Sequence, residues 1–178
     1  MIMSYNINLI LAVDNNNAIG NGDDLLYFFP KDLRRFVSLT KEKTVVMGRK
    51  TWESLPVKLP KRKNIVLTKS SKIEPSMKKG VLVEPDLIVN DLDTILKMSE
   101  NEEIWIIGGA NIYEQFIKYT KTVELTKISA TVSDYDTTVD WLEESLKDFV
   151  ISNNVVLEDV DKMSNDTHLL NFITFNSK

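Results

Sequence analysis

Short, almost continuous hydrophobic runs recur along the chain and are separated by polar segments. Runs of this length predict strands that are buried on both faces of a sheet, because neither face then needs polar side chains. Near the end, two such segments flank the polar loop 161–166 and predict an antiparallel pair. The predicted strands are 6–13, 44–47, 64–68, 81–84, 103–107, 122–132, 149–160 and 168–175.

Between several of these runs, hydrophobic residues recur at helical spacing. Strands that alternate with helices predict an α/β fold, in which helices cover both faces of the sheet. The segment 134–146 is acidic and predicts irregular structure. The predicted helices are 30–40, 52–55, 91–99 and 110–118.

The helix at 30–40 begins with a proline and an acid. Pro30 fits the first helical turn, where its missing N–H group is no loss. Asp32 shares a helix face with Phe36, beside an apolar stripe. An acidic residue in the first turn often serves only the helix dipole. The alternative is a catalytic carboxylate, since a carboxylate near a core is costly to place, and the helix alone does not decide between the two.

Composition narrows the chemistry that the chain could use. It has 178 residues, of which 43% are hydrophobic and 27% charged, which is typical of one globular domain over residues 1–178. Cysteine is absent and His168 is the one histidine, so thiolate nucleophiles and His-rich metal sites are excluded, and we expect no metal ion. No apolar run approaches the roughly 18 residues of a membrane span. Residues 1–13 lack the basic region of a signal peptide, so we expect a cytoplasmic protein without a membrane partner.

Charge is unevenly distributed along the chain. Residues 1–80 carry a net charge of +8 and residues 81–178 carry −12, within a total of −4. A basic half on an acidic protein indicates local anion binding rather than a nucleic-acid partner. Charge blocks are often only solvated faces, so the positions of the basic residues decide between a solvated face and an anion site.

Three predicted strands end in loops rich in glycine, hydroxyl or basic residues, at 48–51, 68–70 and 107–110. Ligands of open α/β sheets bind at the carboxyl ends of strands, and helix N-termini bind phosphates through free N–H groups. No G-x-G-x-x-G fingerprint and no P-loop occurs. The three junctions together indicate a dinucleotide held by scattered elements, although glycine here can also be ordinary turn chemistry.

The segments around these junctions resemble dihydrofolate reductases. The strongest matches are MGRKTWES at 47–54 and IIGGANIYEQF at 106–116. The resemblance covers nearly the whole chain, with the matching pieces in the family's order and spacing. The other pieces are LILAVDNNNAIG at 9–20, P-x-D-L-x-x-F at 30–36, LPKRKNIVLT at 59–68 and LTKI at 125–128.

This resemblance implies a fold and a reaction. The implied fold is a mostly parallel eight-stranded sheet with an antiparallel C-terminal strand, flanked by helices, and we expect a monomer. The implied reaction is the NADPH-dependent reduction of 7,8-dihydrofolate to tetrahydrofolate for one-carbon metabolism and thymidylate synthesis, with hydride transfer to C6 and protonation of N5. In this family the peptide bond between Gly108 and Gly109 is cis, and the loop 14–26 would close over the nicotinamide.

On the substrate side, the resemblance implies that Asp32 binds the pterin, because a carboxylate accepts from N3–H and the 2-amino group together. Thr126 would support it through a hydroxyl, and Arg62 would hold the α-carboxylate of the folate tail. Burial raises the pKa of such a carboxyl and hydrogen bonding lowers it, so the sequence leaves the direction for Asp32 open. The implied apolar walls are Ile10, Ala12, Leu33, Phe36, Leu55, Leu59 and Ile107.

On the cofactor side, the resemblance gives the basic residues of the first half a role. Arg49, Thr68 and Lys69 would surround the 2′-phosphate, which favours NADPH over NADH. Two helix starts, at 50–51 and 109–112, would hold the pyrophosphate. The implied cofactor positions are Ala12, Ile19, Gly48, Arg49, Lys50, Thr51, Leu67, Thr68, Lys69, Ile107, Gly108, Gly109, Ala110, Asn111, Ile112 and Tyr113.

The chain departs from the family pattern just before Pro30. Leu26 and Tyr27 stand where the family usually has Pro-Trp, and that Trp bonds an ordered water near the carboxylate. Tyr27 keeps an aromatic ring with a polar tip, so we count it with Asp32 and Thr126 among the expected catalytic groups. Two alternatives are a reductase of riboflavin biosynthesis, which lacks P-x-D-L-x-x-F, and a non-catalytic protein that binds folate or nucleotides.

Overall fold

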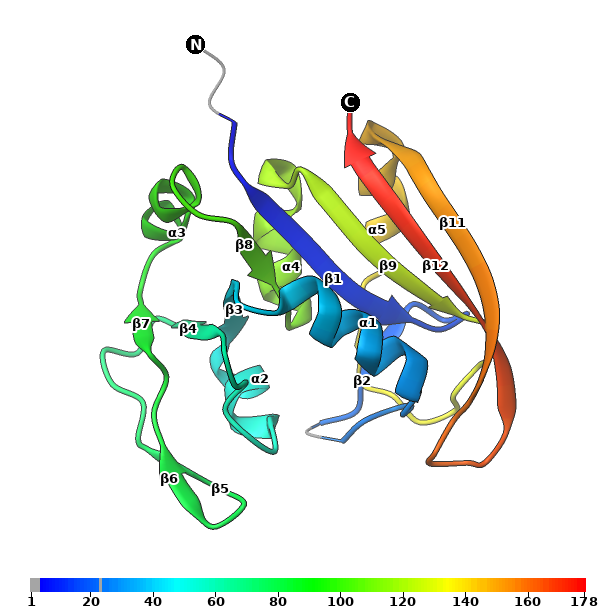
Figure 1. Cartoon of the computed structure of the whole chain (residues 1–178), viewed down its shortest axis with the longest axis horizontal. Helices are drawn as coiled ribbons and strands as arrows, with labels where there is room; N and C mark the ends of the chain where they lie inside the picture. Colours follow the sequence, from blue (N-terminus) through cyan, green and yellow to red (C-terminus); the bar gives the residue numbers. More distant parts are fainter. Residues whose placement is uncertain (1–3, 23) are drawn as a thin grey trace.

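A computed structural model of the chain describes residues 4–22 and 24–178. The expectations for residues 1–3, and for Asp23 within the loop 14–26, lie outside this part. The described residues form one eight-stranded sheet and two small two-stranded sheets (Figure 1). The strands of the large sheet are β1 (Ile7–Val13), β3 (Thr44–Gly48), β4 (Lys63–Leu67), β7 (Leu87–Val89), β8 (Ile104–Ile106), β9 (Thr122–Ile128), β11 (Phe149–Val160) and β12 (Thr167–Ser177).

The large sheet is parallel except for one strand near one edge. Its order is β11-β12-β9-β1-β8-β3-β4-β7, and β12 runs against both of its neighbours. The predicted sheet, mostly parallel with an antiparallel C-terminal strand, is therefore confirmed. In a parallel sheet both faces are covered, which explains why β1 reads as an almost unbroken apolar run.

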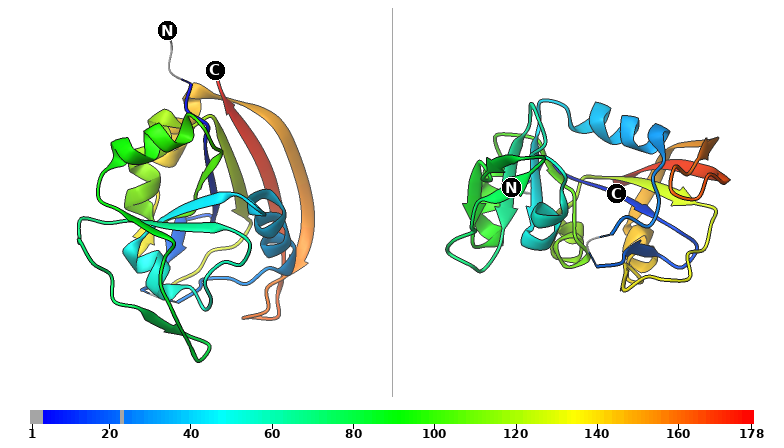
Figure 2. Two further views of the ribbon diagram at one scale, coloured as in Figure 1. Left: turned by 60° about the vertical axis from the view of Figure 1, so that its left-hand side comes forward. Right: turned by 90° about the horizontal axis from the view of Figure 1, so that it is seen from below.

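Helices lie on both faces of this sheet, as predicted. In the right-hand view of Figure 2, α1 (Pro30–Thr40) lies on one side of the sheet, while α4 (Ala110–Phe116) and α5 (Leu142–Ser145) lie on the other. No helix of the described residues is long and apolar enough to cross a membrane. The other helical elements are α2 (Arg49–Ser54), α3 (Leu92–Ser99), η1 (Ile117–Tyr119) and η2 (Leu146–Asp148).

Alternate residues of β1 divide the interior into separate cores. Leu9 and Leu11 belong to a cluster that includes Phe116 of α4, whereas Ile10 belongs to a cluster against which Phe36 of α1 packs. Successive side chains of a strand point to opposite faces, so β1 forms part of both cores. β1 is thereby packed between residues of α4 on one face and of α1 on the other.

The structure corrects several element boundaries. The predicted strand at 81–84 is not in the large sheet, because β6 (Val81–Val83) pairs with β5 (Ser76–Lys78) as a separate hairpin. The eighth strand is β7, whose three apolar residues between polar neighbours were not recognised as a strand in the sequence.

Two further boundaries also differ from the prediction. The predicted strand 122–132 ends at Ile128, where the Ala130 N–H donates to the Ile128 carbonyl in a turn. The segment predicted as irregular contains α5 and β10 (Thr137–Thr138), which pairs with β2 (Ala18–Gly20).

Candidate active site

A cavity of about 1010 Å³ lies at the carboxyl ends of the parallel strands. Its walls come from the ends of β1, β3, β4 and β8 and from the helices that follow them. The structure brings together around it all the positions expected for the cofactor, most of them from the three junctions that are far apart in sequence. These lining residues are Ala12, Ile19, Gly48, Arg49, Lys50, Thr51, Leu67, Thr68, Lys69, Ile107, Gly108, Gly109, Ala110, Asn111, Ile112 and Tyr113.

Two helices begin at this cavity, each after a glycine. The N-caps of α2 and α4 are Gly48 and Gly109, and neither residue supplies a capping side chain. The first N–H groups of both helices are therefore available to an anion in the cavity. Gly108 has φ +122°, which favours glycine, and its peptide bond to Gly109 is cis, as expected. A Cβ on Gly48 would lie 3.1 Å from Ile112 Cγ1, so a larger residue there would press against the start of α4.

Asp32 reaches the same cavity from the first turn of α1. Its Oδ1 accepts a hydrogen bond of 2.6 Å from the hydroxyl of Thr126. Thr126 is buried on β9 and stands opposite Ala12 of β1 in the sheet. The pairing of β9 with β1 places Thr126 beside Ala12, and the start of α1 places Asp32 within reach of Thr126. The carboxylate therefore lies at the cavity, near the end of β1.

The pKa of Asp32 lies above its ordinary value. Burial is the largest cause of the rise, because desolvation disfavours the charged form. The hydrogen bond from Thr126 and the charge of Arg35 act in the opposite direction without reversing it, and the charge of Asp159 adds to the rise. The structure thus decides the direction that the sequence left open.

Most residues expected around the substrate gather in one apolar cluster. Phe36, Leu55 and Leu59 pack against the same core as Ile10 and Ile107. Of the expected apolar walls, the cavity is lined by Ala12, Leu55 and Ile107. Leu33 is half-exposed on α1 and is not part of this cluster.

Arg62 stands next to this apolar group, with its guanidinium carbon 5.9 Å from the centre of the Phe36 ring. Its three nitrogens donate to Thr40 Oγ1 at 2.8 Å, to the Pro60 carbonyl at 2.7 Å and to the Val37 carbonyl at 3.0 Å. These bonds fix the plane of the guanidinium, because a planar fork held at three points cannot turn. Burial lowers its pKa from the ordinary value.

Tyr27 lines the cavity, but its hydroxyl is already engaged. It donates to Asp14 Oδ2 at 3.0 Å. Asp14 is buried and also accepts from the backbone N–H groups of Asn16, Ala18 and Val132. Tyr27 therefore ties the segment before α1 to the turn after β1, and its expected catalytic role stays a prediction.

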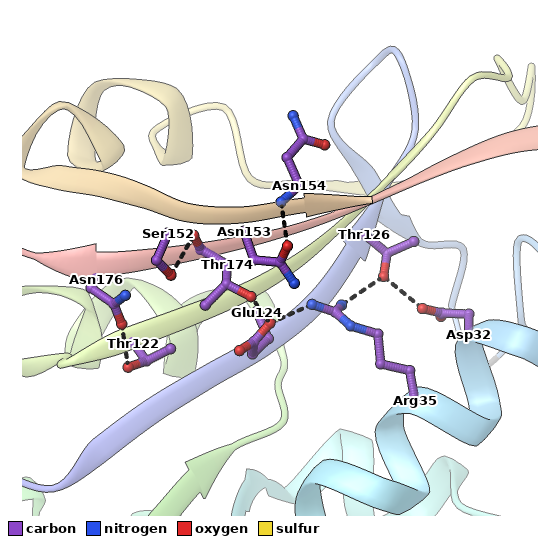
Figure 3. A network of polar contacts seen from close by, with 10 residues as sticks. All are labelled: Asp32, Arg35, Thr122, Glu124, Thr126, Ser152, Asn153, Asn154, Thr174 and Asn176. Atoms are coloured by element: carbon purple, nitrogen blue, oxygen red, sulfur yellow. Dashed lines mark hydrogen bonds and ion pairs between the residues drawn. The ribbon is translucent and has the colours of Figure 1, made fainter. Parts of the chain in front are cut away.

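Sequence reasoning missed some residues of the site. Asn90 lines the cavity and donates to the carbonyls of Thr68 and Ser70, both at 2.9 Å. Beside Thr126, an ion pair joins Arg35 and Glu124 (Figure 3). Spacing could have found this pair, since Arg35 lies three residues after Asp32 on the helix and Glu124 two residues before Thr126 on the strand.

Comparison with known proteins supports one family. The family model described as dihydrofolate reductase matches residues 6–175. The dihydrofolate reductase of Buchnera aphidicola subsp. Acyrthosiphon pisum (strain APS) is 38% identical over 128 residues, which are 71% of this chain and 74% of that protein. The dihydrofolate reductase of Bacillus subtilis (strain 168) is 37% identical over 123 residues, 68% of each chain.

A solved structure has the same fold. It is the dihydrofolate reductase from Enterococcus faecalis complexed with NADP(H) and RAB-propyl, which matches with a TM-score of 0.78 and 24% identity over 97% of this chain and 96% of that one. A family model that matches residues 6–175, and relatives that are 37% and 38% identical over about two thirds or more of each chain, show that this chain belongs to the dihydrofolate reductase family.

Proposed function

We propose that this chain reduces 7,8-dihydrofolate to 5,6,7,8-tetrahydrofolate with NADPH, and that Asp32 holds the pterin while the reaction takes place. The observation that carries the proposal is the Asp32 carboxylate, hydrogen-bonded to Thr126, at the wall of a cavity that also receives the starts of α2 and α4. Membership of the dihydrofolate reductase family supports the reaction. The tetrahydrofolate formed would serve one-carbon metabolism and thymidylate synthesis.

The residues of the cavity fit NADPH. Gly48, Gly108 and Gly109 line the cavity, where a pyrophosphate would lie beside the N–H groups of the two helix starts. The exposed side chains of Arg49 and Lys69, with the Thr68 hydroxyl, would hold the 2′-phosphate and so distinguish NADPH from NADH. The chemistry that NADPH supplies when bound is a hydride for C6 of the pterin.

Asp32 would orient the pterin by accepting hydrogen bonds from N3–H and the 2-amino group. This paired contact favours the charged carboxylate, whereas burial favours the neutral one. The negative charge beside the ring makes N5 easier to protonate, and water would deliver that proton as the hydride arrives at C6. Asp32 therefore acts by orientation and electrostatics, without direct contact with N5.

The remaining substrate positions would form the walls of the folate site. Ile10, Phe36, Leu55, Leu59 and Ile107 would enclose the ring and the benzoyl group in an apolar surface that excludes water. Leu33, on the same helix as Asp32, would be covered only once the substrate is present. Arg62 would hold the α-carboxylate with the N–H groups that its three protein contacts leave free.

Around the nicotinamide, Ala12, Ile19 and Tyr113 would form the contact surface. Tyr113 is fixed by a hydrogen bond of 2.7 Å to the Ile10 carbonyl. Tyr27 would keep the loop after β1 in place through Asp14. We further propose one domain over residues 1–178 that works as a monomer in the cytoplasm; the single large sheet supports the first point, and the mass measured by light scattering would test the second.

The test is an assay of NADPH consumption with dihydrofolate, compared between wild type and Asp32→Asn. We expect turnover by wild type, and a loss of most activity at neutral pH in Asp32→Asn with NADPH binding unchanged, because Asn cannot accept from both pterin donors. Asp93→Asn, in the first turn of α3, is the matched control and should behave as wild type. No turnover by a wild type that binds NADPH would overturn the proposal, and full activity of Asp32→Asn would refute the role of Asp32.

A further inference from the structure

Behind Asp32, a chain of polar side chains links α1 to β9 and β12. The Thr126 hydroxyl donates to Asp32 Oδ1 at 2.6 Å, and the Arg35 Nη1 group donates to the same Thr126 oxygen at 3.2 Å. The other end of the guanidinium forms the ion pair with Glu124, which also accepts from Thr174 Oγ1 at 2.8 Å. Figure 3 shows these contacts as one continuous network that ends at Asp32.

The donors in this network determine the direction of the Thr126 hydroxyl. A guanidinium has only donors, so Thr126 must accept from Arg35. The single hydroxyl proton of Thr126 is then directed to Asp32, which is the contact seen. Without Arg35, the threonine oxygen would lose this donor. The hydroxyl could then rotate so that its proton points away from Asp32. A hydroxyl that always donates favours the charged form of the carboxylate.

Arg35 is held in place by its surroundings. The side chains of Arg35 and Glu124 are 14% and 11% exposed. The guanidinium carbon lies 4.7 Å from the centre of the Phe172 ring, which fixes its plane. Because Glu124 balances the charge, Arg35 stays beside the site without forming an ion pair with Asp32, and the carboxylate keeps its contact with the cavity.

Other charged or titratable groups also face Asp32. Asp159 of β11 raises its pKa by charge repulsion, and Tyr113 of α4 interacts electrostatically with it. Tyr113 stays neutral at physiological pH, because burial raises its own pKa. Arg35 is therefore the cation that acts on Asp32, with Glu124 as the anion that moderates it.

We propose that Arg35 is a positioning residue for Asp32: held by Glu124, it directs the Thr126 proton to the carboxylate and keeps that carboxylate ready to accept the pterin. The inference rests on the proposed function of Asp32 and extends it to a pair of residues on α1 and β9. It assigns opposite electrostatic effects to Arg35 and Glu124, although the two are partners in one ion pair.

The experiment is a titration of Asp32 by carbon-13 NMR of its carboxyl group in protein without substrate. We expect Arg35→Met to raise the pKa of Asp32 and Glu124→Gln to lower it, since the first removes a cation and the second leaves that cation unbalanced. A purely structural disturbance would shift the pKa of Asp32 in the same direction in both variants. Arg34→Met removes the same charge from an exposed position on the same helix and should leave the titration close to that of wild type.

Two further variants complete the test. If Arg35→Met does not fold because Glu124 is left unpaired, Arg35→Met with Glu124→Gln removes both charges, and the pKa of Asp32 should still rise. The shifts in the pKa of Asp32 caused by Arg35→Met and by Thr126→Val should not add in the double variant, because Arg35 acts through Thr126. The apparent pKa in the pH profile of kcat/KM should shift in the same direction as the pKa of Asp32 measured by NMR. Arg35→Met should also bind dihydrofolate about two- to tenfold more weakly at pH 8.

The possible failures are distinguishable. Shifts of the same sign for Arg35→Met and Glu124→Gln, or no shift in either, would overturn the role of Arg35 while normal turnover by wild type left the proposed function intact. An additive combination with Thr126→Val would show that Arg35 does not act through the threonine. Absence of turnover in wild type would instead count against the proposed function, and the titration would still test the effect of Arg35 on Asp32.

Discussion

Replacement of Asp161 by alanine should destabilise the protein, because this residue fastens the C-terminal hairpin to the start of the segment that carries Asp32. Asp161 lies in the turn after β11 and is 3% exposed. Its carboxylate accepts from the Phe28 N–H at 2.9 Å, the Met163 N–H at 3.0 Å and the Ser164 hydroxyl at 2.9 Å. The Lys162 N–H in turn donates to the Phe28 carbonyl at 2.8 Å.

The magnitude follows from the bonds that alanine would remove. Two backbone N–H groups and one hydroxyl would lose a charged acceptor, at about 1 kcal/mol or slightly more each, so the free energy of unfolding should fall by about 2–4 kcal/mol. For a chain of this size, that corresponds to a fall in Tm of about 4–16 °C. Asp161→Asn keeps one acceptor oxygen, so its free energy of unfolding should fall by less than that of Asp161→Ala.

The effect should also depend on pH. Burial raises the pKa of Asp161, but the hydrogen bonds from Phe28, Met163 and Ser164, together with the charge of His168, bring it below the ordinary value. For a carboxyl with a depressed pKa in the folded state, the stabilisation is present above the unfolded-state value, about 3.9, and is lost as pH falls through the folded-state value. The difference between wild type and Asp161→Asn should therefore be full at pH 7 and shrink below about pH 4.

The assay is urea unfolding followed by tryptophan fluorescence, at pH 7 and at several lower values. Asp166→Ala is the control, since Asp166 is an exposed acid in the same turn and should change the stability little. A loss below about 0.5 kcal/mol for Asp161→Ala, which is the size of an ordinary surface substitution, would refute the idea that this turn holds the segment before α1.

Three other predictions concern the site. Arg49→Ala and Lys69→Ala should each lower the ratio of kcat/KM for NADPH to that for NADH by at least about tenfold, and an unchanged ratio would place the 2′-phosphate elsewhere. Tyr27→Phe should lower the free energy of unfolding by about 1 kcal/mol through loss of the bond to Asp14; equal stability in urea would show that this bond contributes nothing. Because the pKa of Asp32 is raised in the folded state, its contribution to stability is fully present below about pH 4 and is lost as pH rises through the folded value. Asp32→Asn should therefore gain stability relative to wild type as pH rises above about 4, and parallel stability curves would contradict the buried position of the carboxylate.

The elements with long local patterns could be predicted from the sequence. β1, β3, β4 and α1 appear within a residue or two of their predicted positions, because a buried parallel strand and a proline-started helix have strong local signals. The strand ends around the cavity were also predictable, since glycine and basic residues follow directly after apolar runs. β5 and β7 were not, because Ser76–Lys78 contains no apolar run and the apolar run of Leu87–Val89 is only three residues long, whereas the one that contains β8 continues to Ile107.

What the sequence by itself determined is the three glycine-rich or basic junctions that line the cavity, since each directly follows a recognisable apolar run, and the resemblance to a family added the other cofactor positions. Only the tertiary structure decided how these groups are connected. The contacts of Arg35 with Thr126 and Glu124, and of Asp161 with Phe28, join residues about 90 to 130 positions apart, and such contacts depend on how α1 packs against β9 and β11. The pKa of Asp32 belongs to the same class, because it is the balance of burial, one hydroxyl and two charges that folding brings together.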